Sequence, residues 1–340
     1  MGKCRRWKNK HYSKIIENQM KILYLCDRKT YLTKMSRVRF HGIRAIGKLC
    51  ELTWSGNGWE NYDSSKTVQE NIDSIYGDQQ PDVVIAYKPL ELKEFSNIKP
   101  TKCIRYNEMY DIEWTIKEIT ESKSNLVICH HRNDMEQYIK MFQSYKEHPV
   151  KFVNIPHCAE KVIYRDYGMP KEYDILLAGA VYTKSLLGDH YPLRIRLAQK
   201  ILPIMSRKYK CKVLQHPGGN LGDAASDRNS FFYAQELNKA KICVTCSGKP
   251  RSRFGKYIEI PMSGAALSAD MPGEEQEKFK QFMIQIDMSM SDEEIINKLT
   301  YYLENEKERQ KLVDKGYEYA IEYTQEKYAQ KFLEVVNELG

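Results

Sequence analysis

Short apolar runs alternate with longer amphipathic stretches along most of the chain. The first apolar run, KILYLCD at residues 21–27, ends in an acid and is followed by a helix-like stretch at residues 36–49. Strands that alternate with helices in this way are typical of parallel sheets. Further strands are predicted at residues 51–54, 81–87, 102–106, 126–130 and 150–155, and helices at residues 68–76 and 135–145.

The alternation stops after Pro156 and then begins again. Residues 157–173 show little periodicity and contain Gly168 and Pro170, which predicts a linker. The second alternation has strands at residues 173–181, 211–214 and 241–245, helices at 193–206 and 232–240, and a helical end from residue 292. The sequence therefore predicts an α/β protein of two Rossmann-like doubly wound domains that face a cleft. The expected parts are a basic arm at residues 1–20, a first Rossmann-like domain at 21–158, a second Rossmann-like domain at 159–325, and a C-terminal helix at 326–340 that packs back on the first domain.

Size and composition agree with two soluble domains. A chain of 340 residues exceeds what one core usually fills, and 42% hydrophobic residues suffice for two cores. No apolar run approaches the ~20 residues that span a bilayer, and no signal-like stretch follows the basic start, so we expect a cytoplasmic protein. The nine cysteines lack the spacing of a disulfide scaffold and are expected to be free thiols. Cys243 and Cys246 have CxxC spacing, but their run predicts a buried strand rather than a metal site.

The formal net charge of +8 predicts an anionic partner. Nucleotide phosphates, nucleic acid and an anionic membrane surface all satisfy this condition. Much of the excess lies in the arm, which suggests peripheral contact with an anionic surface. Within residues 1–20, the bases Lys3, Arg5, Arg6, Lys8, Lys10 and Lys14 face the single acid Glu17.

Two segments of the second domain carry candidate chemistry for a phosphorylated ligand. In YDILLAGAVYTKS, residues 173–185, Gly179 follows a strand at the turn where Rossmann-like domains approach phosphate. Nearby Lys184 and Arg194 supply positive charge for a leaving pyrophosphate. In residues 247–270, a loop rich in bases leads into a short helix that contains Glu259, which is suited to bind the two hydroxyls of a ribose.

The remaining predicted donor-binding residues surround Glu259. Arg251, Arg253 and Lys256 are placed to meet phosphate oxygens, and Ser263 and the backbone at Gly264 supply further hydrogen-bond donors. Tyr257 completes the predicted set. The alternative is an ordinary connection between a helix and a strand, with Glu259 solvated and Gly264 ending the helix. The residues alone do not choose between these two interpretations.

Four blocks in the same order resemble a known family. They are IPHCAEKVIY, YDILLAGAVYTK, FFYAQELNKAKICVTCS and YIEIPMSGAALSAD, which begins at Tyr257. From about residue 156 to residue 326 the chain resembles the group 1 glycosyltransferases of the GT-B fold, particularly the branch similar to spore-maturation proteins. The resemblance implies that the domain at residues 21–158 binds the acceptor and that the domain at residues 159–325 binds the donor. It also implies a nucleotide-sugar donor as co-substrate and no other cofactor. It also implies that Glu259 holds the ribose and that phosphate lies near Lys184 and Arg253.

Two positions depart from the family pattern. Many retaining members have an acid eight residues before the ribose-binding Glu, where this chain has Arg251, so the stereochemistry of transfer stays open. Pro261 lies inside the short helix and predicts a kink or an early end.

The first domain has no diagnostic motif, so the catalytic base is sought at strand ends that face the cleft. The candidates are Glu108, Asp111 and His131, with His41 and His130 as further possibilities and His157 at the domain junction. The leading hypothesis is transfer of a sugar from a nucleoside diphosphate sugar to an unidentified saccharide, lipid, protein or DNA acceptor, without a metal. The alternatives are a nucleotide-sugar epimerase, a nucleic-acid-binding or DNA-modifying protein, and a non-catalytic sugar-binding relative.

Overall fold

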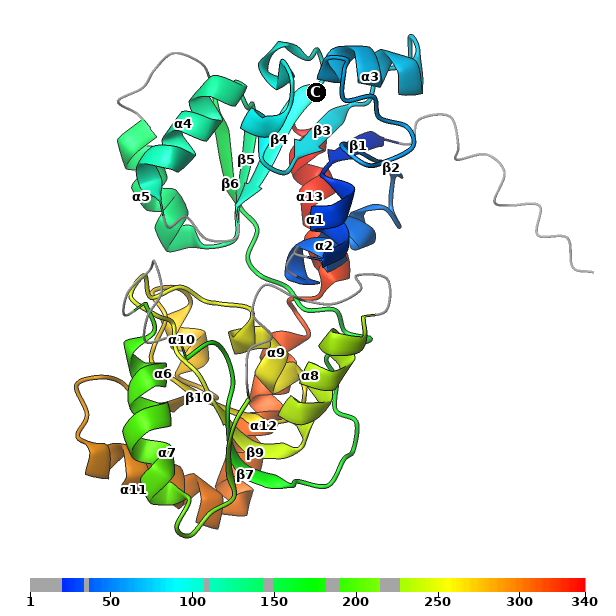
Figure 1. The fold of residues 1–340 in the computed structure, drawn as a ribbon. Coiled ribbons are helices and arrows are strands. Elements are labelled where there is room, and N and C mark those ends of the chain that lie inside the picture. Colours follow the sequence, from blue (N-terminus) through cyan, green and yellow to red (C-terminus); the bar gives the residue numbers. More distant parts are fainter. Residues whose placement is uncertain are drawn as a thin grey trace, which may run out of the picture.

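Two parallel sheets, each covered by helices, form two domains (Figure 1). This computed structural model describes residues 20–33, 37–106, 111–142, 149–181, 190–214 and 227–339. None of the described helices is long and apolar enough to cross a membrane. The described cysteines are free thiols, as predicted.

The first domain contains a six-stranded sheet in the order β2-β1-β3-β4-β5-β6. Alternate side chains of the first strand point to opposite faces of the sheet. Ile22 and Tyr24 pack in one core cluster, and Leu23 and Leu25 pack in another. Helices therefore cover both faces of the sheet. The strands are β1 (Lys21–Leu25), β2 (Glu51–Ser55), β3 (Val83–Ala86), β4 (Thr101–Tyr106), β5 (Leu126–Cys129) and β6 (Lys151–Asn154). The helices are α1 (Arg28–Thr33), α2 (Arg37–Ile46), α3 (Val68–Tyr76), α4 (Ile112–Ser122) and α5 (Arg132–Phe142), with short 3₁₀ turns at Pro89–Glu91 and Phe95–Asn97.

The second domain contains a five-stranded sheet in the order β11-β10-β9-β7-β8. Its central strands are almost entirely buried, as expected for a parallel sheet covered on both faces. The strands are β7 (Tyr173–Leu177), β8 (Cys211–Val213), β9 (Ala240–Val244), β10 (Ala266–Ala269) and β11 (Ile284–Gln285). The helices are α6 (Pro192–Arg196), a π-helical turn (Leu197–Ile201), α7 (Leu202–Met205), α8 (Arg228–Asn238), α9 (Lys256–Met262), α10 (Gln276–Phe279), α11 (Asp292–Glu304) and α12 (Glu306–Ala320).

The chain passes between the domains twice, first near Ala159 and again between Tyr323 and Gln325, and the two passages lie side by side. The backbone N–H of Ala159 donates to Tyr323 O at 2.9 Å, and the N–H of Gln325 donates to Ala159 O at 3.1 Å. Beyond this junction, α13 (Gln325–Asn337) packs against α2, and its residue Phe332 joins the core of the first domain. Figure 1 shows the C-terminus within the first domain.

The predicted fold class is confirmed: both sheets are parallel and Rossmann-like, in two domains of one α/β chain. The prediction from the pattern omitted α1, α4, α10 and β11. It expected α9 to be kinked or shortened at Pro261, and α9 ends at Met262, one residue beyond this proline.

Candidate functional site

Three predicted donor-binding residues meet at the carboxyl end of β7. Gly179 has a φ of 113°, a conformation that favours glycine. A Cβ atom at this position would lie 2.6 Å from Arg194 Nη1 and 2.9 Å from Lys256 Cε. The bare backbone therefore lets two cationic side chains approach the turn. Ligands of open α/β sheets bind at this end of the strands.

Arg194 is held in place by contacts that leave part of its guanidinium unused. The side chain is buried, Nη2 donates to Cys246 O at 3.1 Å, and the guanidinium carbon lies 3.9 Å from the centre of the Tyr191 ring. Its Nε has no hydrogen-bond partner among the described residues. Backbone and aromatic contacts thus fix the Arg194 guanidinium, and one of its N–H groups has no partner among the described residues. Such a cation is suited to hold an anion.

Glu259 is a buried carboxyl on α9, one turn after Lys256. Burial raises the pKa of Glu259, while the Lys256 charge and the Tyr164 hydroxyl act in the opposite direction. Burial also raises the pKa of Tyr164 and Tyr233, and the nearby Glu259 raises both further. Burial of this carboxyl lowers the stability of the fold. Carboxyls with a pKa shifted by burial are common at functional sites.

Tyr257, Ser263 and Gly264 make contacts that shape the domain. The Tyr257 hydroxyl donates to Asp270 O at 2.8 Å, and its ring is fully buried. Ser263 ends α9, and a Cβ on Gly264, whose φ is 71°, would touch Asp166. The structure therefore places Ser263 and Gly264 at the opposite end of α9 from the Gly179 turn. Donor binding by these three residues stays a prediction.

Arg253 lies inside the protein and not on an open phosphate-binding surface. Its Nη1 donates to Tyr319 at 2.8 Å and to Glu275 at 3.1 Å, and its Nη2 donates to His157 O at 3.2 Å. The side chain has no exposed area, and these partners occupy both terminal nitrogens of the guanidinium, whereas Nε has no partner among the described residues. The phosphate contact of Arg253 stays a prediction.

The backbone of Arg251 contacts the first domain, and its guanidinium donates to Met271 O of the second domain at 3.4 Å. Its side chain is exposed, its φ is 53°, and its carbonyl accepts from Asn133 Nδ2 at 3.2 Å. Nearby, the N–H of Arg132 donates to Glu274 at 3.1 Å. The base-rich loop thus contributes to contact between the domains at the start of α5.

Three histidine rings gather where the domains meet. The centres of His130 and His131 each lie 4.8 Å from that of His157, and His131 lies 5.3 Å from Phe254 of the second domain. Neither ring nitrogen of His131 has a hydrogen-bond partner among the described residues. Burial, helped by the Arg253 charge, lowers the pKa of His131 to about 3. His131 is therefore neutral at pH 7, and its imidazole is a weaker base in this buried position than it would be in water.

The other proposed bases have different surroundings. Asp111 caps α4, where its side chain accepts from the Trp114 N–H at 2.9 Å. His41 Nε2 lies 2.8 Å from Asp227 of the second domain, and Arg44 also contacts Asp227 at 2.8 Å. Sequence reasoning missed Asp227, because no local pattern reveals a partner 186 positions away. Glu108, Lys184 and the basic arm lie outside the described residues.

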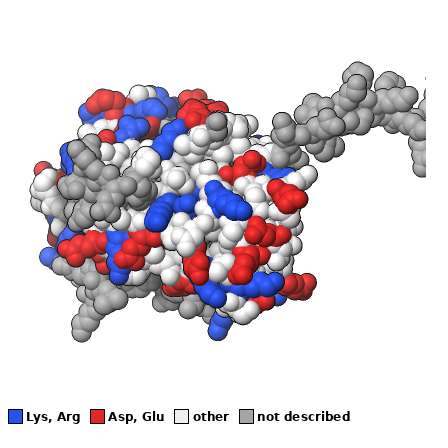
Figure 2. Space-filling view, turned by 90° about the horizontal axis from the view of Figure 1, so that it is seen from above, with Lys and Arg blue, Asp and Glu red and all other residues white. Residues whose placement is uncertain are grey.

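Charged side chains of both signs share the surface of the molecule. On the face drawn in Figure 2, Lys and Arg side chains are interspersed with Asp and Glu. Within the described part of the chain, no group of three or more His, Cys, Asp and Glu side chains is placed to hold a metal ion. Metal independence of the reaction remains an expectation.

Solved structures with the same architecture cover nearly the whole chain. A glycosyltransferase from Rickettsia africae matches with a TM-score of 0.60 and 14% identity, over 94% of this chain and 98% of its own. Sucrose-phosphate synthase from Thermosynechococcus elongatus matches with 0.59 and 11%, over 94% and 99%. Anabaena HepE in complex with UDP matches with 0.60 and 10%, over 94% and 100%. The chain has a GT-B fold.

Two further matches are weaker. A candidate UDP-N-acetylglucosamine 2-epimerase from Listeria monocytogenes has a TM-score of 0.50 and 12% identity, over 93% of this chain and 95% of its own. The pneumococcal O-GlcNAc transferase GtfA has a TM-score of 0.49 and 14% identity, over 75% of this chain and 56% of its own. No family model and no curated protein sequence matches the chain.

Proposed function

We propose that the protein is a glycosyltransferase that moves a sugar from a nucleoside diphosphate sugar to an acceptor. The observation that carries the proposal is the meeting of Gly179, Arg194 and Lys256 at the carboxyl end of β7, beside the buried carboxyl of Glu259. The GT-B fold supports it, and the UDP and UDP-glucose complexes of HepE make a uridine diphosphate sugar the first donor to test. Membership of the spore-maturation branch stays a proposal.

In the proposed reaction, the bond from the anomeric carbon to the diphosphate breaks, and the diphosphate leaves with the electron pair. Arg194 and Lys256 stabilise the negative charge that develops on the leaving oxygen. The acceptor oxygen forms the new bond to the anomeric carbon and gives up its proton. His131 is the base that we favour, because it lies at the domain junction and its two ring nitrogens have no hydrogen-bond partner among the described residues. Asp111 is less suited, because its carboxylate already caps α4.

Glu259 gives this proposal its sharpest test. Exchange of Glu259 for Gln keeps the shape but removes the charge that we expect to accept bonds from ribose hydroxyls. We expect the Kd for UDP, measured by calorimetry, to rise about tenfold or more, since a hydrogen bond to a charged group contributes about 1.5–3 kcal/mol. The matched control is Glu277→Gln on the exposed surface of α10, with an unchanged Kd.

The same variant should gain stability at neutral pH. The pKa of Glu259 is raised in the folded chain, so folding disfavours the charged carboxylate. The resulting loss of folding free energy is complete above the folded pKa. It vanishes below the ordinary value of 4.5. The gain of Glu259→Gln in free energy of unfolding should therefore shrink as the pH falls. Unchanged UDP affinity in this variant would remove Glu259 from the donor site.

The epimerase remains the second candidate, because one matching structure carries that description. Incubation of the protein with UDP-N-acetylglucosamine alone separates the two activities. An epimerase converts the sugar without an acceptor, whereas a transferase leaves the sugar unchanged until an acceptor is added.

A further inference from the structure

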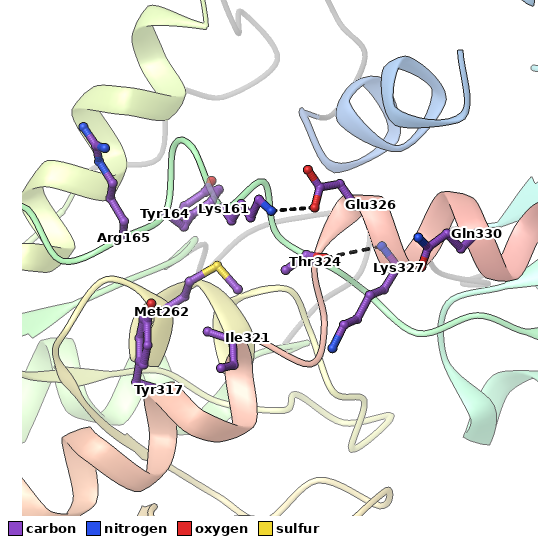
Figure 3. A pocket seen from close by; sticks show the side chains of 10 residues that line it. All are labelled: Lys161, Tyr164, Arg165, Met262, Tyr317, Ile321, Thr324, Glu326, Lys327 and Gln330. Carbon is purple, nitrogen blue, oxygen red and sulfur yellow. Dashed lines mark hydrogen bonds and ion pairs between the residues drawn. The ribbon is translucent and has the colours of Figure 1, made fainter. Parts of the chain in front are cut away.

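A cavity of about 340 Å³ lies where both chain passages run between the domains (Figure 3). Lys161 and Tyr164, which follow the first passage, line one side. Tyr317 and Ile321, near the end of α12, and Lys327, in the first turn of α13, line the other. The cavity is distinct from the nucleotide site, since Gly179, Arg194 and Lys256 are not among its lining residues. Its volume is within the range of small-molecule sites.

Apolar surface is exposed in this cavity. Tyr317 and Ile321 lie four residues apart on the same side of the chain and are 43% and 38% exposed. Beside them, Met262 also lines the cavity (Figure 3). Exposed apolar side chains that gather in a concave site favour a ligand with an apolar part.

Most charged side chains that line the cavity are cationic, and their ion pairs with neighbouring carboxylates are weak. Lys161 contacts Glu326 at 2.6 Å, and Lys327 contacts Glu322 at 2.6 Å. All four side chains are about half exposed or more, so both ion pairs contribute little and can be exchanged for another anion. In Figure 3 Lys161 reaches across to Glu326, whereas the Arg165 guanidinium points away from the other labelled side chains.

We propose that this cavity binds a small organic anion that carries an apolar group. The anionic group lies between Lys161 and Lys327, and the apolar group lies on Ile321 and Tyr317. The ligand then contacts the first passage, the end of α12 and the start of α13, which belongs to the core of the first domain. Occupancy therefore restrains movement of the two domains. Tyr164 provides a link to the nucleotide site, because its hydroxyl lies beside Glu259.

Phenyl phosphate is the probe, since it combines an anionic group with a flat apolar ring. Calorimetric titration of the full chain is carried out in the presence of saturating UDP, which occupies any nucleotide site. We expect phenyl phosphate to bind both with and without saturating UDP, and more tightly than inorganic phosphate. In the double variant Lys161→Ala, Lys327→Ala the affinity should fall at least tenfold, and in Ile321→Asp by a similar factor.

The matched control is the double variant Lys311→Ala, Lys331→Ala. It removes the same two charges from exposed ion pairs on α12 and α13 outside the cavity, and its affinity should be unchanged. Circular dichroism establishes that each variant is folded, and Ile321→Ala replaces any variant that is not. Absence of binding, equal loss in the control, or displacement of the probe by UDP would each overturn the proposal. The titration does not depend on transfer activity, so it stands or falls separately from the proposed function.

Discussion

Gly179 shows how a single backbone conformation determines the candidate donor site. Its φ of 113° places the chain so that Arg194 and Lys256 come within contact distance of where a side chain would begin. Any other residue would meet two obstacles: the strain of a positive φ and the space already taken by these two cations. The two obstacles can be separated, because Gly168 also has a positive φ but no atom within 4 Å of the point where a Cβ would lie.

We predict that Gly179→Ala loses both stability and affinity. The strain should lower the free energy of unfolding by about 1–3 kcal/mol, and displacement of Arg194 should weaken UDP binding. Gly168→Ala is the control: it should lose about 1–2 kcal/mol for its left-handed conformation but keep its Kd for UDP. Urea unfolding and calorimetry measure the two quantities. Equal Kd values for UDP in both variants would contradict the assigned position of the phosphates.

At the scale of elements, the buried guanidinium of Arg253 connects the loop before α9 to Glu275, at the start of α10. Arg253 contacts Glu275, Tyr319 and the carbonyl of His157, and its guanidinium carbon lies 4.2 Å from the centre of the Tyr323 ring. Burial would raise the pKa of Glu275, but the Arg253 charge and the bonds from Lys278, Tyr323 and Tyr319 lower it to about 2. This network connects the second domain to both chain passages.

We predict that Arg253→Met is destabilising, by about 1.5–3 kcal/mol, because Glu275 loses a charged partner but keeps Lys278 and the two tyrosine hydroxyls. Lys280→Met, which breaks only an exposed pair with Glu277, should change stability by less than about 0.5 kcal/mol. The measurement is denaturant unfolding at neutral pH. A loss in Arg253→Met no greater than that in the control would refute the structural role of the network.

The pH dependence of the same network has a defined sign. The folded pKa of Glu275, about 2, is below its ordinary value of 4.5. Its stabilising contribution is therefore present above pH 4.5 and is lost as the pH falls toward 2. Glu275→Gln should remove this part of the acid-induced loss of stability.

The elements differ in how well the sequence reveals them. The apolar period predicts α3 correctly, and a capping box of Thr67 and Glu70 fixes its start. Helix α4 is rich in β-branched residues, which favour strands locally, and it is stabilised by the Asp111 cap and by burial of Ile116 and Ile119. Strand β11 has two residues, too few for any period.

The candidate site shows the same limit. The sequence places Glu259 and the bases around it in one segment, but the partners of each base come from distant parts of the chain. Arg194 and Lys256 share the Gly179 turn, whereas Arg253 turns inward to Glu275 and Tyr319. The spacing of residues in the sequence predicts which side chains could bind a ligand. Tertiary packing decides which of them already bind other protein groups.

At the scale of the whole molecule, polar contacts join the two domains at separate places. Asp227 at the start of α8 accepts from Arg44 and pairs with His41, both on α2. Elsewhere, Asn133 and Arg132 at the start of α5 contact the loops around Arg251 and Glu274. These contacts favour one relative arrangement of the domains. Loss of one of them should therefore shift the population between arrangements.

We predict that Asp227→Asn shifts the molecule toward a more open arrangement. Burial alone would raise the pKa of Asp227, but the bonds from His41 and Arg44 keep it below its ordinary value, so the carboxylate is charged and paired at neutral pH. The amide loses the charge attraction to Arg44, which should increase the radius of gyration in small-angle X-ray scattering. Asp292→Asn is the control, since Asp292 pairs with Arg196 within the second domain, and its scattering should match that of the unchanged protein. Saturating UDP should reduce the difference, because a ligand held between the domains favours the closed arrangement. Scattering curves of Asp227→Asn that coincide with those of the control would show that the remaining contacts fix the domains without Asp227.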